Sequence, residues 1–459
     1  MNRMLDRVRH GLRGDGLRAR ALRSSGLTLM GYAGSQVLRL ASNLILTRLL
    51  FPEAFGVMVL VSIFMMGLAM FSDVGVGPSI LQSKRGDDPE FLNTAWTIQV
   101  IRGALLWVAT CVLAVPAATF YDAPQLAQLL PVAGMTLLIT GLNPTRLESA
   151  NRHLMLGRVT AIDFVTQISG IVAAVLMAWW LQSVWALVLS GLLSALVQLY
   201  LYNVYLPGER NRFRWEKSAA EELIRFGKWI FLSTLAGFLL FQGDKVILGK
   251  FLTLEALGVF NIGYFLASFP LLLGGMVVRK TLIPIYRELP PKESPENFAK
   301  LRKMRYGLSA LILILLAMFA MSGVVLVNFM YDARYALAGG IVVIVAAMQV
   351  PSVVVLTYDQ AALAAGDSRQ FFVLSAVRAV LTLAGLLLGV QYFGLMGALI
   401  GQGVAYVLAY PVVVWLARSQ GTWDPLHDAV IFALGVAVAG FACWINMDAI
   451  IALSAMNSP

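Results

Sequence analysis

The chain has 459 residues, of which 59% are apolar and only 13% charged, and its mean hydropathy is +0.77. An ordinary soluble domain carries about 25% charged residues, so this composition excludes a soluble globular protein and predicts a chain that lies in a lipid bilayer. The net charge of +10 does not indicate nucleic acid, because its distribution along the chain explains it below. The two cysteines, Cys111 and Cys443, are too few and too isolated for a disulfide framework or a metal site.

The first 26 residues form a basic segment with seven arginines. This segment is too long and too polar for the start of a signal peptide, and no small-residue cleavage site follows the first apolar run. We therefore expect residues 1–26 to be an uncleaved cytoplasmic arm, with Leu5, Val8 and Leu12 lying against anionic lipid.

Apolar residues gather in segments long enough to cross a membrane, which takes about 20 residues. The thirteen segments are 27–50, 54–80, 93–119, 125–147, 159–181, 183–205, 226–251, 255–279, 306–329, 337–362, 370–392, 394–417 and 429–447. They predict an all-α integral membrane protein with two pseudo-symmetric six-helix bundles around a central cavity, followed by one extra helix. The bundles occupy 27–205 and 226–417, a cytoplasmic linker occupies 206–225, and the extra helix and tail occupy 418–459.

The first predicted helix carries a polar stripe. Gln36, Arg39 and Asn43 are spaced i, i+3 and i+7, which puts them on one helix face, with Ser35 and Ser42 beside them. Such a face predicts contact with a water-filled cavity.

Three short sequence motifs each occur twice in the chain, and the second copies follow the same order as the first. "LTRLLFPEAFGVMVL" (46–60) nearly recurs as "LGKFLTLEALGVFNI" (248–262), and "FYDAP" (120–124) as "MYDAR" (330–334). In a weaker match, Gly157-Arg158 corresponds to Ser368-Arg369, and each pair begins an apolar segment. These echoes indicate two homologous halves. With six helices in each half, both halves start in the cytoplasm, so the repeat is parallel.

The basic residues follow this topology. With a cytoplasmic amino terminus, 28 of the 35 lysines and arginines fall in cytoplasmic segments, which is the positive-inside asymmetry of membrane proteins. No predicted external loop is longer than about ten residues once the helices are counted. No external catalytic domain is therefore expected.

Four cations and one carboxylate are predicted at membrane depth, where ionisable groups are costly and commonly functional. Counting about 1.5 Å per residue puts Arg102 and Arg378 in the inner half of the membrane. By the same count Arg39 lies near the middle and the Asp244-Lys245 pair in the outer half. Two interpretations stay open for the arginines: they line the cavity, or they form buried ion pairs that hold helices together.

Three aspartates, Asp73, Asp163 and Asp359, lie near the cytoplasmic ends of predicted helices. They are either interfacial carboxylates and helix caps, or partners for the buried arginines. Asp73 is, with Asp244, also a candidate for binding a coupling ion. Helix breaks are predicted at 75–78 in "SDVGVGPS" and at Pro351.

The sequence contains no P-loop, no metal-ligand cluster and no nucleophile elbow. The histidines His10, His153 and His427 all fall in predicted cytoplasmic segments, away from any transmembrane proton relay. We therefore expect no cofactor, no metal and no enzymatic activity.

Two stretches carry a family resemblance: "GDKVILGKFLTLEALGVFNIGYFLAS" (243–268), and "SDVGVGPSILQ" (72–82) after "LLFPEAFGVMVL" (49–60). They resemble the polysaccharide-transporter branch of the multidrug, oligosaccharidyl-lipid and polysaccharide exporter superfamily. The resemblance implies a bacterial inner-membrane flippase for undecaprenyl-diphosphate-linked repeat units of O-antigen or exopolysaccharide, with two bundles in a V that work by alternating access. Cavity cations are common in this family.

The resemblance gives the polar residues a ligand. Arginine binds phosphate oxygens in a bidentate way, so we expect a lipid-linked diphosphate to contact the cavity residues Gln36, Arg39, Asn43, Arg102, Lys245 and Arg378. Further partners implied are membrane lipids, a polysaccharide polymerase and glycosyltransferases, with no nucleic acid, and the protein is expected to be a monomer.

Three alternatives stay open. A cation-coupled drug exporter of the same superfamily would need carboxylates deep in the cavity, whereas the deep charges here are mainly positive. A lipid II flippase of that superfamily would have fourteen helices. A membrane-embedded polysaccharide polymerase or ligase would need a long external loop for its catalytic residues.

Overall fold

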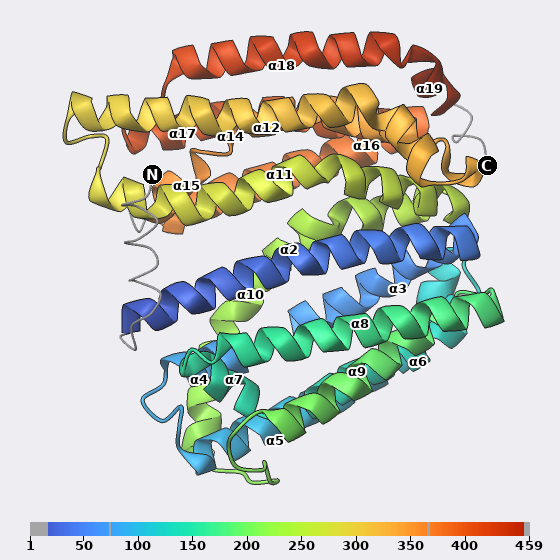
Figure 1. Cartoon of the computed structure of the whole chain (residues 1–459), viewed down its shortest axis with the longest axis vertical. Coiled ribbons are helices and arrows are strands. Elements are labelled where there is room, and N and C mark those ends of the chain that lie inside the picture. The colour runs from blue at the N-terminus through green and yellow to red at the C-terminus, as the bar shows by residue number, and fades with distance from the viewer. Residues whose placement is uncertain (1–16, 73–74, 365–367, 454–459) are drawn as a thin grey trace, which may run out of the picture. The chain divides into compact units, whose positions relative to one another are not determined.

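The computed structural model describes residues 17–72, 75–364 and 368–453, and these residues form helices and turns with no strand among them (Figure 1). The predicted all-α fold class is confirmed for this part of the chain. The amino-terminal sixteen residues and Asp73 lie outside it.

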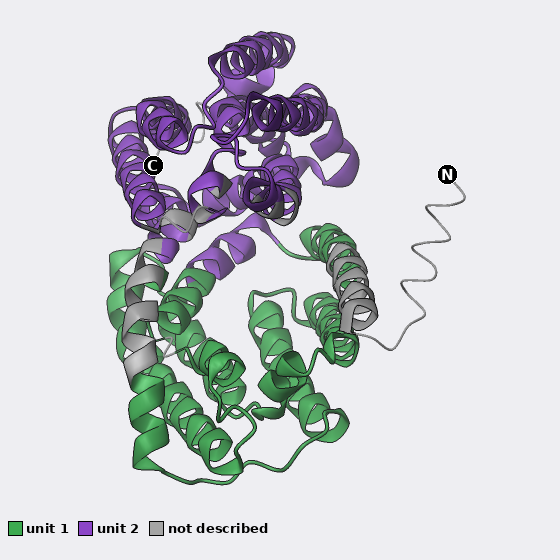
Figure 2. Cartoon of the chain, turned by 90° about the vertical axis from the view of Figure 1, so that its left-hand side faces the viewer, with its two compact units in different colours: residues 1–50, 61–235 green, residues 51–60, 236–459 purple. Residues whose placement is uncertain are grey.

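The chain divides into two compact units (Figure 2). Unit 1 consists of residues 1–50 and 61–235, and unit 2 of residues 51–60 and 236–459. The first half of the chain forms the helices α2 (Leu17–Leu49), α3 (Pro52–Phe71), α4 (Val76–Gln82), α5 (Pro89–Phe120), α6 (Leu126–Gly141), α7 (Arg146–Arg152), α8 (Leu156–Leu181) and α9 (Trp185–Tyr205). Helix α3 begins in unit 2 and ends in unit 1.

The second half begins with α10 (Lys217–Phe251), whose first part, up to Leu235, belongs to unit 1. The remaining helices are α11 (Leu254–Glu288), α12 (Pro295–Met330), the 3₁₀ helix η1 (Ala333–Tyr335), α13 (Ala338–Met348), α14 (Val350–Val355), α15 (Asp359–Ala364), α16 (Ser368–Leu408), α17 (Tyr410–Ser419), α18 (Pro425–Ile445) and α19 (Met447–Ala452). Helix α16 is two helices joined at Phe393 and Gly394, whose backbone angles are not helical.

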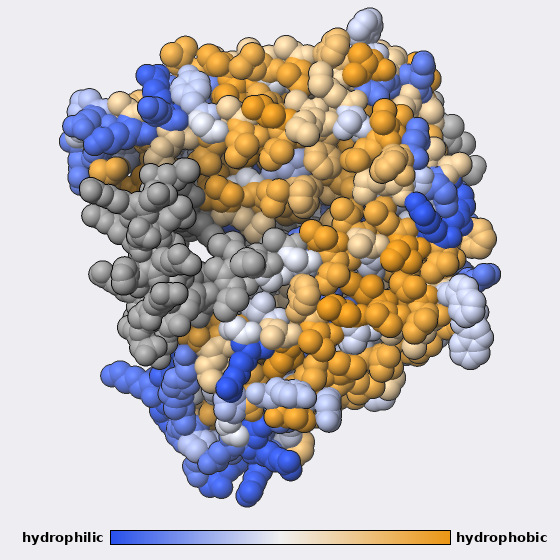
Figure 3. Space-filling view, viewed as in Figure 1, coloured by the Kyte–Doolittle hydropathy of each residue, from blue (hydrophilic) through white to orange (hydrophobic). Residues whose placement is uncertain are grey.

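Every predicted apolar segment contains helix, but the predicted arrangement of twelve core helices and one extra helix is not confirmed. Among the described residues, eight helices are long and apolar enough to cross a membrane, or nine if the bent pair α6 and α7 is one span. Helices α2 and α10, which carry many polar and charged residues, are not among them. In the view of Figure 3, hydrophobic residues cover the later part of α8 and much of α12, and hydrophilic residues gather toward the ends of helices.

Both predicted helix breaks are confirmed. Helix α3 ends at Phe71 and α4 begins after Gly75, which has a left-handed backbone (φ 63°) that suits a residue without a Cβ. Pro351 lies in the first turn of α14, directly after α13 ends. Proline is tolerated there because the first helical N–H groups have no intrahelical acceptor.

The first repeated motif (46–60 and 248–262) includes the beginnings of α3 and α11. Its two copies pack against each other within unit 2. A Cβ on Gly56 would lie 1.8 Å from the Leu254 carbonyl oxygen, and one on Gly258 would lie 2.1 Å from the Pro52 carbonyl oxygen. The absence of side chains at these two glycines is therefore what lets the two backbones approach. The motif recurs because both helices use the same surface at their contact.

The other two repeated motifs also occupy corresponding positions in the two halves of the chain. Tyr121 is the C-cap residue of α5 and Tyr331 is the C-cap residue of α12. Gly157 and Ser368 lie in the first turns of α8 and α16. Equivalent sequence thus begins or ends equivalent helices in the two halves of the chain.

Candidate functional site: polar groups within the apolar helices

Arg102, on α5, contacts the end of α3. Its Nε donates a hydrogen bond to Ser72 Oγ (2.9 Å) and its Nη2 donates to the Ala69 carbonyl oxygen (2.6 Å). The last carbonyl groups of a helix lack intrahelical donors and carry partial negative charge, so a guanidinium group stabilises them. Arg102 therefore links α5 to α3, a contact that the sequence alone did not reveal.

Arg378, on α16, forms an ion pair with Asp359 at the start of α15. Arg378 Nη1 lies 2.6 Å from Asp359 Oδ2, and the two side chains are 21% and 18% exposed. Among the described residues, Arg378 Nη2 and Asp359 Oδ1 have no hydrogen-bond partner. This is the buried ion pair that the sequence left open as one interpretation, and it retains one unused donor on the arginine.

The polar stripe on α2 has a partner in unit 1. Ser35 Oγ donates to Gln167 Oε1 of α8 (2.6 Å), and Gln167 Nε2 donates to the Ser35 carbonyl oxygen (2.8 Å). On the stripe itself, Gln36 and Asn43 are partly buried, whereas the side chain of Arg39 is exposed. Arg39 thus projects from a face that is already polar.

The Asp244-Lys245 pair on α10 splits between two environments. Asp244 is buried, with 8% of the residue exposed, and Lys245 Nζ donates to Gln242 Oε1 one turn earlier (3.2 Å). Asp244 also interacts electrostatically with Tyr264 of α11 and Tyr406 of α16. A buried carboxylate therefore lies beside two tyrosines of unit 2.

These tyrosines belong to a larger buried polar cluster. Gln402 Nε2 donates to Tyr406 Oη (3.0 Å), and Gln349 Nε2 donates to Ser268 Oγ (3.3 Å). Within the described part of the chain, three acceptor oxygens here lack hydrogen bonds: Asp244 Oδ1, Gln349 Oε1 and Gln402 Oε1. Buried acceptors without donors are costly, so this cluster is chemically suited to receive a proton or a cation.

A second buried network in unit 2 was not predicted. Arg305 is 1% exposed, donates to the Thr422 carbonyl oxygen and to Tyr286 Oη, and stacks over the Tyr358 ring at 4.1 Å. Next to it, Arg302 pairs with Asp424 through two hydrogen bonds of 2.5 and 2.7 Å. These contacts join α12 to the loop before α18.

His427 lies in the first turn of α18 and is fully buried. Its Nδ1 lies 2.9 Å from Asp428 Oδ1 and its Nε2 lies 3.0 Å from Ser309 Oγ. This order of groups resembles a hydrolase triad. Ser309 is 0% exposed, however, and the neighbouring pocket of about 310 Å³ is lined by Asp428 and not by Ser309. The arrangement therefore supports a packing role.

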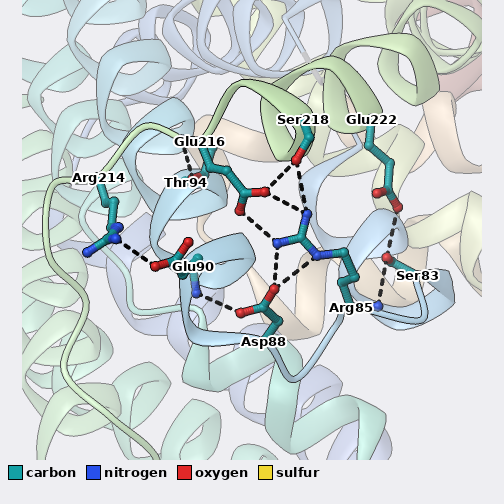
Figure 4. Close-up of polar contacts among 9 residues, drawn as sticks. All are labelled: Ser83, Arg85, Asp88, Glu90, Thr94, Arg214, Glu216, Ser218 and Glu222. Atoms are coloured by element: carbon teal, nitrogen blue, oxygen red, sulfur yellow. Dashed lines mark hydrogen bonds and ion pairs between the residues drawn. The ribbon is translucent and has the colours of Figure 1, made fainter.

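A charged cluster surrounds the start of α5 in unit 1 (Figure 4). Arg85 binds Asp88 at 2.5 Å and Glu216 at 2.7 Å, and Arg214 binds Glu90 at 2.6 Å. The hydrogen bond from Arg85 holds the pKa of Glu216 at about 2 and lowers the pKa of Asp88. Both carboxylates consequently keep their charge throughout the physiological pH range.

The fold defined by these helices is that of membrane transporters. It is similar to the inward-facing conformation of a multidrug resistance MATE family transporter of the MOP superfamily, with a TM-score of 0.61 and 15% identity over 84% of this chain and 94% of that one. It is also similar to the lipid II flippase MurJ in an inward closed conformation, with a TM-score of 0.66 and 11% identity over 94% of this chain and all of that one. At these identities the likeness establishes the fold.

Residues 45–338 match the family described as "Polysaccharide biosynthesis protein", and the chain belongs to this family. It is 24% identical over 270 residues to the succinoglycan biosynthesis transport protein ExoT of Rhizobium meliloti (strain 1021), covering 58% of this chain and 54% of the relative. It is 21% identical over 281 residues to the lipopolysaccharide biosynthesis protein WzxC of Escherichia coli (strain K12), covering 60% and 55%. The chain thus spans about half the length of the curated relatives it matches. The family resemblance that the sequence motifs indicated is therefore confirmed.

Proposed function

We propose that this protein is a flippase, and not an enzyme, that moves a lipid-diphosphate-linked oligosaccharide from the cytoplasmic to the outer leaflet by alternating access. One observation carries the proposal: a member of a polysaccharide biosynthesis family has the fold of membrane transporters, among them a lipid II flippase. The succinoglycan transport relative supports the same substrate class. In this mechanism the lipid tail stays in the bilayer while the sugars and the diphosphate cross through a wet cavity.

The diphosphate is the group that is most costly to carry through hydrocarbon, because it is charged. Arg39 is the first candidate to bind it, since this exposed side chain shares a helix face with Gln36 and Asn43. A charge-assisted hydrogen bond from a guanidinium group to a phosphate oxygen is among the strong polar contacts in proteins. Hydroxyl groups or phosphate oxygens of the substrate would form hydrogen bonds with the side-chain amides of Gln36 and Asn43.

The other three basic side chains are weaker candidates for binding the diphosphate. Arg378 keeps one unused donor beside its ion pair with Asp359, so it could bind a phosphate oxygen without breaking that pair. Arg102 has committed two of its nitrogens to α3. Lys245 donates to Gln242, and it would serve as a secondary contact near the outer side.

Transport needs an energy source, and Asp244 is the candidate for coupling. Its carboxylate is buried and interacts with Tyr264 and Tyr406, and Asp244 Oδ1 lacks a donor among the described residues. A proton or a sodium ion bound to this carboxylate would neutralise it, and its release would restore the buried charge. Asp73 remains a second candidate from the sequence.

The proposed location is the bacterial inner membrane, with the amino terminus in the cytoplasm. The distribution of 28 of 35 basic residues supports this orientation. On this view the protein receives its substrate from glycosyltransferases in the cytoplasm and delivers it to a polymerase outside. We propose that the monomer is the working unit.

Replacing Arg39 with alanine is expected to slow flipping about tenfold, because one charge-assisted contact to the diphosphate is lost. The assay uses proteoliposomes that hold a labelled undecaprenyl-diphosphate-oligosaccharide and measures its appearance in the opposite leaflet. Arg48→Ala is the matched control, since Arg48 is also an exposed arginine of α2, at the last turn. Equal rates for wild type and Arg39→Ala would contradict the role of Arg39, and absence of flipping by well-folded wild-type protein would contradict the function.

A coupling role for Asp244 predicts that transport depends on pH or on sodium and that Asp244→Asn removes this dependence. Asparagine keeps the size of the side chain but cannot release a proton or hold a cation by charge. Asp448→Asn, at an exposed carboxylate on α19, should leave the dependence unchanged. A pH and sodium profile that is identical in Asp244→Asn and wild type would exclude this role.

A cation-coupled drug exporter is the second candidate, because a MATE transporter has the same fold and Asp244 is a buried carboxylate. The two functions are separated by substrate: cation-driven uptake of dyes or drugs into the same proteoliposomes, without flipping of the lipid-linked oligosaccharide, would favour the exporter.

A further inference from the structure

An extended segment between α9 and α10 crosses the start of α5, and we call residues 207–216 the strap. Three backbone N–H groups of the strap are bound by side chains of α5: Arg212 N donates to Asn93 Oδ1 (2.8 Å), Arg214 N to Thr97 Oγ1 (3.0 Å) and Glu216 N to Thr94 Oγ1 (3.0 Å). Alternate residues thus bind the same helix.

The beginning of the strap is held as firmly. Asn211 Nδ2 donates to Thr145 Oγ1 (2.8 Å), and the Thr145 amide donates back to Asn211 Oδ1 (3.0 Å). Two ion pairs complete the attachment, from Arg214 to Glu90 and from Glu216 to Arg85 (Figure 4). The strap is therefore a fixed surface of unit 1 and not a loose connection.

This fixed surface presents two large aromatic side chains outward. Phe213 is 69% exposed and Trp215 is 57% exposed. Phe213 contacts Trp96 of α5 with ring centroids 4.8 Å apart, and most of its surface is still uncovered. Exposed aromatic side chains on an anchored backbone are typical of a binding surface.

The same surface carries surplus positive charge. Residues 207–217 include four basic side chains and two glutamates. Arg214 pairs with Glu90, whereas Arg85 is shared by Glu216 and Asp88 and so leaves one carboxylate charge in excess. This charge and Glu209 are set against the exposed Arg210, Arg212 and Lys217, so the balance stays positive by one. An anionic partner fits this balance.

The strap also lies at a defined depth on its helix. Asn93, Thr94 and Thr97 follow the start of α5 at Pro89, so the strap crosses within about 6 to 12 Å of the beginning of that apolar helix at 1.5 Å per residue. Because α5 has 32 residues and about 20 are enough to cross the bilayer core, its first turns are suited to the membrane–water interface, where aromatic side chains anchor and basic side chains attract anionic headgroups.

We propose that the strap is a docking surface for anionic phospholipid headgroups of the leaflet that it faces. That leaflet is the cytoplasmic one in the orientation proposed above, whereas the flipping activity is not required for the inference. Phe213 and Trp215 enter the headgroup region, and Arg210, Arg212 and Lys217 bind phosphate oxygens. The lipid surface thereby fixes the start of α10, which directly follows the strap.

The test places an environment-sensitive fluorophore (NBD) at position 215 of the full-length protein, as Trp215→Cys with Cys111→Ser and Cys443→Ala. The labelled protein is reconstituted into nanodiscs of phosphatidylcholine, with or without phosphatidylglycerol. Phosphatidylglycerol should shift the emission to shorter wavelength and increase quenching by spin-labelled lipid. Raising the salt concentration should reverse the shift, because exposed charges are screened.

Arg210→Gln, Arg212→Gln and Lys217→Gln together should abolish the response to phosphatidylglycerol. A label at Trp180→Cys is the matched control: Trp180 is 81% exposed in the last turn of α8, and its signal should not depend on phosphatidylglycerol. A probe at 215 that iodide quenches equally in both lipids would overturn the proposal and favour a soluble partner. A response that persists in the triple variant or at high salt would equally overturn it.

Discussion

Replacing Arg378 with alanine is expected to destabilise unit 2 by about 3 kcal/mol, because the change leaves Asp359 buried without its cation. The two groups lie 2.6 Å apart and each is about four-fifths buried. Removing one member of such a pair exposes the desolvation cost of the other. The measurement is the thermal unfolding midpoint of the purified protein in detergent, and a midpoint equal to that of the wild type would contradict the expectation.

The double variant Arg378→Ala with Asp359→Asn separates the two roles that the sequence left open for this arginine. Neutralising Asp359 removes the unpaired charge, so the double variant should regain most of the lost stability. If Arg378 also binds the diphosphate through its unused Nη2, the double variant will be stable and still flip slowly. Wild-type flipping by a stable double variant would assign Arg378 to structure alone.

The positions of helices could be predicted because apolar runs and backbone preferences are local properties. The break before α4 follows from Gly75 and the break before α14 from Pro351, and both are visible in a few residues. The repeat could also be recognised from sequence, since Gly56 and Gly258 occupy the same place in the two copies. What the repeat does became clear only when the two copies were found in contact.

The partners of charged side chains could not be predicted, because they come from distant parts of the chain. Arg102 binds the end of α3, and Arg378 binds Asp359, which lies 19 residues earlier at the start of α15. The burial of His427 was not predicted either, because hydropathy alone misses the polar first turn of a helix. The signal was present: Asp424 precedes Pro425 as an N-cap, which marks a helix start before the apolar run.

The substitution with the largest expected effect on packing lies at the contact between the two copies of the repeated motif, where α3 and α11 begin. Gly258→Ala would place a methyl group 2.1 Å from the Pro52 carbonyl oxygen and 3.0 Å from the Gly56 nitrogen. Backbone atoms cannot rotate away as a side chain would, so the starts of α3 and α11 must separate. Overpacking of this kind costs about 3 kcal/mol, and we expect a large fall in the amount of folded protein in the membrane.

A glycine farther along the same helix provides the matched control. A Cβ on Gly275 of α11 would meet nothing within 4 Å, so Gly275→Ala should be neutral or stabilise the helix by up to about 1 kcal/mol through its higher helix propensity. The comparison uses membrane abundance and the thermal midpoint of both variants. If Gly258→Ala matched Gly275→Ala, close backbone approach could not be the reason for the repeated glycine. If only Gly258→Ala fails, the duplicated motif is explained by one contact that requires a glycine on each side.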